Sequence, residues 1–295
     1  MPMPTIQITH HTVYQHGGPS TAAWQMLQLQ PRNEATQECL DFQLDIFPSA
    51  PDLTSRTDYF GNIRHFFSIR EAHQEMTITS HSTVKRTADV RPLPGIALPL
   101  TSAREQVARL IRDRGQFELE QYLHATVRVP LLPAAAALAD GLDADHTPLL
   151  EWIEQLGRKF AENFTFDATA TDVSTPLTEV LQTRRGVCQD FTHLLLSCLR
   201  QQGLPAAYVS GYLLTNPPAG QPRLIGADAM HAWVSIFVPE VGWVDYDPTN
   251  TCFAGSGHIV VARGRDYSDV SPTRGVFSGG GGHTLKIGVT VEPEE

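Results

Sequence analysis

A cysteine, a histidine and two aspartates in this chain have the residue types of a nucleophilic site. Cys188 lies in "RRGVCQDFTHLLLSCLRQQG" at the polar start of an apolar run. His231 opens "HAWVSIFV", and Asp245 and Asp247 lie in "GWVDYDPTN". A thiolate attacks a carbonyl carbon when a base stands beside it, and a carboxylate holds the imidazole base in one orientation. These residues therefore suggest covalent acyl transfer through a cysteine.

The stretch around Cys188 predicts a helix that begins near that cysteine. Its apolar residues repeat at helical spacing and are Phe191, Leu194, Leu195, Cys198 and Leu199. Gly203 followed by Leu204-Pro205 is a typical helix end. Free N–H groups and the positive end of the helix dipole favour a thiolate at the helix start. We therefore expect Cys188 to be the nucleophile, whereas Cys198, Cys39 and Cys252 are expected to be structural.

His231 and the two aspartates are expected on neighbouring strands. "HAWVSIFV" and "GWVDYD" are joined by "PEVG", which predicts a hairpin that places a histidine beside an aspartate. Asp245 and Asp247 fall on the same face of their strand, so alternation alone does not choose between them.

The elements that must hold these residues fall into two parts. "CLDFQLDIF" alternates apolar and polar residues, and "TIQI", "WQMLQLQ", "NIRHFFSI" and "EMTITSHSTVKR" follow the same pattern. Strands at this spacing predict a small β-sandwich-like domain. "RPLPGIALPL" breaks the pattern, so we predict a β-rich domain at residues 1–95 and a second part at 96–295.

The second part predicts helices followed by an antiparallel sheet. Ser102 and Glu105 form a capping-box pattern, while Thr147 and Pro148 predict the cap and first residue of another helix. "TPLTEVL" repeats the Thr-Pro start. The later strand-like runs are "AAYVSGYLL", "HAWVSIFV", "GWVDYD", "HIVVA" and "HTLKIGVTVE". The order predicts an α+β fold in which the nucleophile helix packs on an antiparallel sheet.

Composition excludes several classes of protein and partner. The 295 residues carry a net charge of −10 and show no basic cluster, which argues against nucleic-acid binding. The sequence has no apolar run of about 18 residues and no signal-peptide pattern, so no membrane segment is expected. The four scattered cysteines fit a reducing compartment. We therefore predict a cytoplasmic protein, and its oligomeric state stays open.

A metal site is an alternative to the nucleophilic site. Cys188, His231, Asp247 and His258 could be drawn as a zinc set, but these residues lack the closely spaced ligand pairs of structural zinc sites. The sequence also lacks a calcium-binding loop pattern. We expect neither a metal nor another cofactor, and His258 is otherwise expected to be a surface or packing residue.

Several motifs in order resemble the bacterial transglutaminase-like superfamily, a branch of the papain-like cysteine enzymes. They are "GVCQDF", "SGY", "HAWV", "GWVDYDPTN" and "GRDYSDVSPTRG", within about residues 150–292. "DYFGN" at 58–62 resembles part of the β-rich domain that precedes this core in many bacterial members. The resemblance implies a papain/transglutaminase-like core in which Cys188 is the nucleophile, His231 the base and Asp247 the triad acid.

The resemblance also implies a reaction. Bacterial relatives are generally regarded as cysteine proteases, so it implies hydrolysis of peptide or carboxamide bonds by a protease or amidase acting on a peptide or protein. An amine acceptor in place of water would make the chain a transglutaminase. A non-catalytic peptide-binding or assembly module is the alternative of another class. The family's second oxyanion donor has no motif here, and Gln189 and Tyr212 are the suggested candidates.

Overall fold

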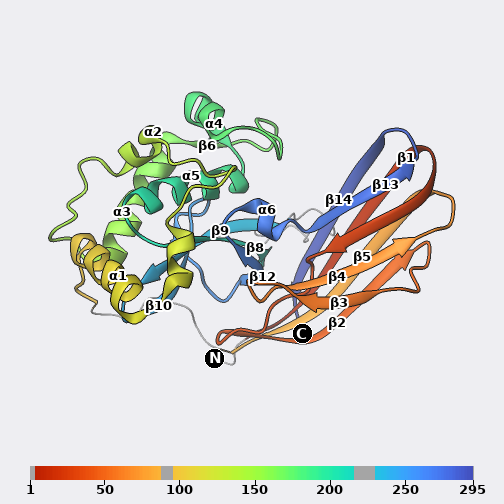
Figure 1. Ribbon diagram of the computed structural model, residues 1–295, viewed down its shortest axis with the longest axis horizontal. Helices are drawn as coiled ribbons and strands as arrows, with labels where there is room; N and C mark the ends of the chain where they lie inside the picture. The colour runs from red at the N-terminus through yellow and green to blue at the C-terminus, as the bar shows by residue number, and fades with distance from the viewer. Residues whose placement is uncertain (1–3, 88–95, 216–229, 295) are drawn as a thin grey trace, which may run out of the picture.

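The computed structural model describes residues 4–87, 96–215 and 230–294. It combines a large antiparallel sheet, built mainly from the N-terminal residues, with a core in which helices pack on a second antiparallel sheet (Figure 1). This is the α+β class that the sequence patterns predicted. No helix among the described residues has the length and apolar character that crossing a membrane requires.

The N-terminal sheet is organised around one long strand. Its strands are β1 (Thr5–Leu27), β2 (Gln37–Phe47), β3 (Thr54–Thr57), β4 (Ile63–Ile69) and β5 (His73–Arg86), in the order β2-β5-β1-β4-β3. The first half of β1 pairs with β5 and the second half with β4. "TIQI" and "WQMLQLQ", predicted as separate strands, are therefore two parts of β1.

The last two strands of the chain also join this sheet. β13 (Thr273–Gly279) and β14 (His283–Pro293) both pair with β1 (Figure 1). The sequence pattern predicted "HTLKIGVTVE" in the later sheet, within the part 96–295, and the observed pairing corrects that assignment. Alternation identifies a strand but not its partner, because pairing depends on segments far apart in the sequence. The predicted boundary at 95/96 adjoins residues 88–95, which lie outside the described residues.

The two halves of β1 face each other across an apolar interior, which gives the N-terminal part its sandwich-like form. The buried cluster combines residues of β1, β4 and β5, together with Leu29, and half-buried residues of β2 and β13 pack against it. Its buried members are Tyr14, Ala23, Leu27, Leu29, Phe67, Ile69, Met76 and Ile78. Because both halves contribute, the bent sheet closes over its own core.

A helical segment links the two sheets. It contains α1 (Leu100–Arg114), η1 (Phe117–Tyr122), α2 (Pro133–Ala136), η2 (Ala137–Ala139), α3 (Leu149–Asn163), β6 (Thr165–Phe166), α4 (Leu177–Thr183) and β7 (Arg185–Gly186). The N-caps of α1 and α3 are Pro99 and Pro148, without side-chain caps. The predicted caps at Ser102 and Thr147 are therefore wrong. The Leu149 N–H donates to the Leu98 carbonyl at 2.7 Å, so a tertiary contact takes the place of a side-chain cap.

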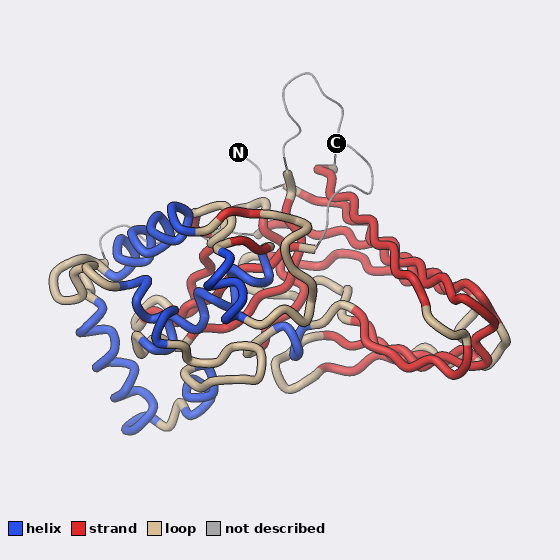
Figure 2. Tube along the Cα trace, turned by 90° about the horizontal axis from the view of Figure 1, so that it is seen from above, coloured by secondary structure: helices blue, strands red, loops and turns tan. Residues whose placement is uncertain are grey.

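Helix α5, which was expected to carry the nucleophile, packs on the second sheet, as predicted (Figure 1). Figure 2 shows the longer helices gathered toward one end of the molecule and the long strands toward the other. The remaining elements are α5 (Cys188–Gln201), β8 (Ala206–Leu213), β9 (His231–Val238), β10 (Gly242–Asp247), β11 (Cys252–Phe253), β12 (His258–Gly264) and α6 (Tyr267–Val270). The strand order is β11-β10-β9-β8-β12. Helix α3 also lies close to this sheet, since a Cβ on Gly157 would come within 1.7 Å of the Tyr246 hydroxyl.

Two amide side chains from the N-terminal part pair with the edge strand β12. Gln37 donates to the Val260 carbonyl and accepts from the Val260 N–H, each at 2.8 Å. Asn62, the last residue of "DYFGN", makes the same pair of 2.8 Å bonds with the backbone of Arg263. Apolar residues of β1, β5 and β14 share one hydrophobic cluster with the second sheet. The polar groups of an exposed sheet edge are thus satisfied at the junction of the two parts.

Candidate active site

Cys188 is the first residue of α5, where the sequence analysis predicted it. The helix start is held by Asp190, whose carboxylate accepts from the Val187 N–H at 2.8 Å and from the Thr171 hydroxyl at 2.6 Å. A Cβ on Gly186 would come within 2.8 Å of that carboxylate, so the glycine leaves room for it. Cys188 itself is half-buried and free of any disulfide. Its backbone therefore has a fixed position at the positive end of the helix.

The β9–β10 hairpin brings the predicted base and acid together. His231 is the first residue of β9 and Asp247 the last of β10, and their Nε2 and Oδ2 atoms are 2.7 Å apart. The Cys188 side chain also interacts with this imidazole and helps to raise its pKa. Because Nε2 is engaged by Asp247, Nδ1 is the ring nitrogen left for the sulfur. The three side chains, from α5, β9 and β10, thus meet at one place.

The charges at this place favour a protonated imidazole. Burial disfavours the cation, but hydrogen bonds and charge interactions with Asp247 and Cys188 outweigh it and raise the pKa of His231 to about 10. Burial acts to raise the pKa of Asp247, yet hydrogen bonds from His231 and His258 hold it well below its usual range. At neutral pH the site therefore holds an imidazolium beside a carboxylate.

Asp245, the rival carboxylate, has a different set of partners. It accepts from the Trp233 indole at 3.0 Å and from the Ser235 hydroxyl at 2.6 Å. The Arg263 guanidinium donates to both of its oxygens at 3.0 Å. Asp245 and Asp247 do share a face of β10, but the hairpin register sets Asp245 opposite Ser235. Asp245 is therefore the anion of a buried ion pair.

Two side chains that the sequence analysis did not assign to the site also hold Asp247. His258 Nε2 lies 3.1 Å from Asp247 Oδ2, and the Asn250 side-chain amide donates to the same oxygen at 2.7 Å. The backbone N–H groups of Thr249 and Asn250 bond to Oδ1 at 2.9 and 3.1 Å. The Asx-turn pattern in "DPTN" could have indicated Asn250. His258 opens the apolar run "HIVV" as His231 opens "HAWV", which was the available signal.

The same histidines and Asp247 could be drawn as metal ligands, since their donor atoms lie within 4.8 Å of one another. The Gly255 N–H, however, donates to His258 Nδ1 at 3.2 Å. That bond requires a lone pair on Nδ1, so the proton of the neutral ring lies on Nε2 and points to Asp247. A metal on Nε2 would have to displace this proton. The donor set therefore fits hydrogen bonding better than metal coordination.

The two suggested oxyanion donors are directed to other partners. The Tyr212 hydroxyl lies 3.0 Å from Nδ1 of His10 in β1, so it belongs to the junction between the two parts. The Gln189 side-chain amide is 3.4 Å from the Val173 carbonyl, in the loop before α4. Gln189 adjoins Cys188 in the chain, and its role as an oxyanion donor stays a prediction.

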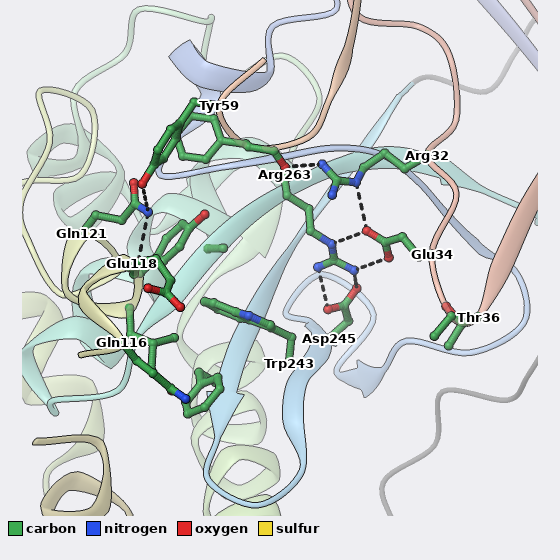
Figure 3. Close-up of a pocket in the computed structure, with 16 residues that line it drawn as sticks. Arg32, Glu34, Thr36, Tyr59, Gln116, Glu118, Gln121, Trp243, Asp245 and Arg263 are labelled. Atoms are coloured by element: carbon green, nitrogen blue, oxygen red, sulfur yellow. Dashed lines mark hydrogen bonds and ion pairs between the residues drawn. The ribbon is translucent and has the colours of Figure 1, made fainter. Parts of the chain in front are cut away.

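A cavity of about 740 Å³ lies at the junction of the N-terminal part, η1 and the second sheet (Figure 3). Its lining does not include Cys188, His231 or Asp247. Arg263 forms part of the lining and binds Glu34 at 2.8 and 2.9 Å as well as Asp245 (Figure 3). The ion pairs that join the N-terminal part to the sheet thus form part of the cavity wall.

Family comparisons match both parts of the chain. The bacterial transglutaminase-like N-terminal region matches residues 6–85, and the transglutaminase-like superfamily matches residues 136–248. The second match contains Cys188, His231 and Asp247. It ends before β13 and β14, so neither match includes the two strands that complete the N-terminal sheet.

Individual relatives extend these matches. An uncharacterized protein of Mycobacterium bovis is 36% identical over 307 residues, covering 98% of this chain and 93% of its own length. The protein-glutamine gamma-glutamyltransferase of Pseudomonas aeruginosa is 33% identical over 121 residues, which is 40% of this chain and 18% of that protein. The crystal structure of a suspected cysteine protease from Cytophaga hutchinsonii superposes with a TM-score of 0.73 at 16% identity, covering 99% and 91% of the two chains. That likeness establishes the shared fold.

Proposed function

The chain belongs to the transglutaminase-like superfamily, and from this premise we propose that it is a cysteine-dependent acyl-transfer enzyme acting on peptide or protein substrates. The observation that supports the proposal most strongly is the 2.7 Å hydrogen bond between His231 and Asp247, together with the interaction of the same imidazole with Cys188. Cys188 is the nucleophile, His231 the acid and base, and Asp247 the group that orients the imidazole.

The proposed reaction passes through a thioester. The Cys188 thiolate attacks the carbonyl carbon, and the Cys188 backbone N–H, at the first turn of α5, is available to the developing oxyanion. His231 gives its Nδ1 proton to the departing amine as the C–N bond breaks. The acceptor then gives a proton to His231 as it bonds to the thioester carbonyl carbon, and the C–S bond breaks to release the acyl product and restore the Cys188 thiolate. Asp247 stays ionised throughout.

Water and a primary amine are the two acceptors to consider. We propose hydrolysis as the main outcome, in line with the suspected cysteine protease that shares the fold along nearly the whole chain. Amine transfer is the second candidate, because a segment of the catalytic core is 33% identical to part of the Pseudomonas aeruginosa gamma-glutamyltransferase. A purely binding role is less well supported, because it gives no reason for an imidazolium held beside Cys188 and Asp247.

Incubation with a peptide library, with and without putrescine, tests the proposal. Mass spectrometry should detect cleaved peptides with the wild-type chain, and peptides that gain the amine if transfer competes. Cys188→Ala should abolish both products, whereas Cys39→Ala, a change in the N-terminal sheet, should leave them unchanged. Product formation by the Cys188→Ala chain at the wild-type rate would overturn the proposal.

A further inference from the structure

We propose that His258 is a positioning residue that holds the Asp247 carboxylate, and through it the His231 ring, in the orientation that Cys188 requires. The inference deepens the proposed function and rests on it. His258 lies 11 residues after Asp247 as the first residue of β12, on the far side of β8 from His231. It contacts Asp247 and not the nucleophile, so it acts through the acid.

The hydrogen bonds of His258 give the ring a fixed role. Its Nδ1 accepts from the Gly255 N–H at 3.2 Å, which places the ring proton on Nε2. Nε2 then donates to Asp247 Oδ2 at 3.1 Å. His231 donates to the same oxygen at 2.7 Å. Two imidazoles from different strands therefore meet on one carboxylate oxygen.

The other oxygen of Asp247 is held independently. Oδ1 accepts from the backbone N–H groups of Thr249 and Asn250, at 2.9 and 3.1 Å. With both oxygens engaged, rotation of the carboxylate breaks several bonds at once. If His258 were removed, one direction of restraint on Oδ2 would disappear. The His231 ring would then lose part of the support that aims its Nδ1 at the sulfur.

The packing around His258 keeps this ring in place. The Trp233 indole lies edge-on against it, with the ring centroids 5.2 Å apart and an angle of 83° between the planes. Trp233 is fully buried, and its N–H is anchored on Asp245 at 3.0 Å. Gly211 in β8 makes room for the indole, because a Cβ there would approach the ring to 2.5 Å. This gives the "SGY" glycine a structural reason.

The pKa of the His231 ring depends on the polar and titratable groups that face it. They are Asp247, the Cys188 side chain, the Asn250 amide at 3.4 Å from Nε2 and the His258 ring at 6.4 Å between centroids. A substitution of His258 acts on His231 through Asp247. The pKa of His231 is therefore a direct measure of how well Asp247 is held.

His258→Asn and His258→Gln separate positioning from bulk stability. Both replacements are polar, but the longer Gln side chain can place its amide near the position of Nε2, whereas Asn cannot. In the Asn variant we expect iodoacetamide to alkylate Cys188 about tenfold more slowly at pH 6.5. This factor corresponds to the free energy of one lost hydrogen bond to a charged group. The pKa of His231, followed by NMR of ¹³C-labelled histidine, should fall. The Gln variant should recover most of the alkylation rate of Cys188 and most of the pKa of His231. His146→Leu, which replaces a side chain that is 84% exposed, should change neither the rate nor this pKa.

Three outcomes would overturn the inference. The first is an Asn variant with the wild-type alkylation rate and His231 titration. The second is equal loss in the Gln and Asn variants. The third is an alkylation rate of Cys188 that decreases across the variants only in proportion to their melting temperatures. Failure of the proposed function looks different, because Cys188 of the wild-type chain would then react no faster than an ordinary thiol. These readouts need no substrate, so each result identifies which claim has failed.

Discussion

At the residue scale, the proposed chemistry depends on one imidazolium, that of His231, placed between Cys188 and Asp247. His231 contacts Cys188 on one side and Asp247 on the other. The residue types and their order predicted these three positions, but not Asn250 or His258. The contact of His258 in β12 with Asp247 in β10 has no local sequence pattern, because it depends on how the strands are arranged in the sheet. Strand alternation left Asp245 and Asp247 open, and the family resemblance favoured Asp247. The structure adds that Arg263, from β12, pairs with Asp245.

The pH dependence of the reaction should reflect the raised pKa of His231. The imidazolium that protonates the leaving amine is present below about pH 10 and is lost as the pH rises through that value, against 6.5 for an ordinary histidine. We therefore expect peptide turnover to fall above about pH 10. In Asp247→Asn the carboxylate charge is gone, so the alkaline limb should move to lower pH. An unchanged limb in pH–rate profiles of this variant would contradict the assignment.

At the element scale, the start of α5 and the β9–β10 hairpin are the parts that place the site. Both followed from local patterns, namely the apolar stripe after Cys188 and two strands joined by "PEVG". The caps of α1 and α3 did not, because the Thr101 N–H bonds to the distant Ala144 carbonyl and the Leu149 N–H bonds to the distant Leu98 carbonyl. Local patterns thus found the elements, whereas tertiary contacts decided where two of them begin.

Gly186→Ala should disturb the start of α5. The new Cβ would lie 2.8 Å from the Asp190 carboxylate and displace it from the Val187 N–H. We expect a loss of stability of about 1–3 kcal/mol and slower alkylation of Cys188. Gly282→Ala is the matched control, since a Cβ there has nothing within 4 Å. Equal melting temperatures and alkylation rates for the two variants would show that the glycine is not required.

At the scale of the whole molecule, the N-terminal part and the transglutaminase-like core are joined by strands, side-chain amides and ion pairs. The predicted parts 1–95 and 96–295 did not include the return of β13 and β14 to β1. Glu34, Arg263 and Asp245 connect the N-terminal part to the sheet that carries His231 and Asp247. Such long-range pairings are set by the complete fold, so a single sequence did not reveal them.

Arg263→Met should weaken the whole fold. It would leave Glu34 and Asp245, with side chains 18% and 8% exposed, without their shared cation, which destabilises by about 3–5 kcal/mol at neutral pH. Although burial opposes ionisation, Arg263 holds the pKa of Asp245 below its usual value in the native chain. The stabilisation from this ion pair is present above the pKa of Asp245 in the unfolded chain and is lost as the pH falls through its lower native pKa. Urea unfolding should therefore show a smaller difference in free energy between the wild-type and Arg263→Met chains in acid than at neutral pH.

Arg109→Met is the control for this change. Its ion pair with Glu105 has both side chains 64% exposed, and its loss should alter stability by less than about 1 kcal/mol. A similar effect of the two substitutions at neutral pH would argue against a structural role for the ion pairs at the junction.

The central claim is that His231 and Asp247 activate Cys188, and the chain contains its own reference thiols. Burial raises the pKa of Cys39 to about 11 and also raises that of Cys252, and both residues are half-buried like Cys188. The most direct measurement is the iodoacetamide alkylation rate of each cysteine at pH 6.5, resolved by peptide mass spectrometry. We expect Cys188 to react much faster than Cys39 and Cys252, and to lose this advantage in the His231→Ala variant. Equal rates for the three cysteines, or a Cys188 rate that His231→Ala does not change, would contradict the central claim.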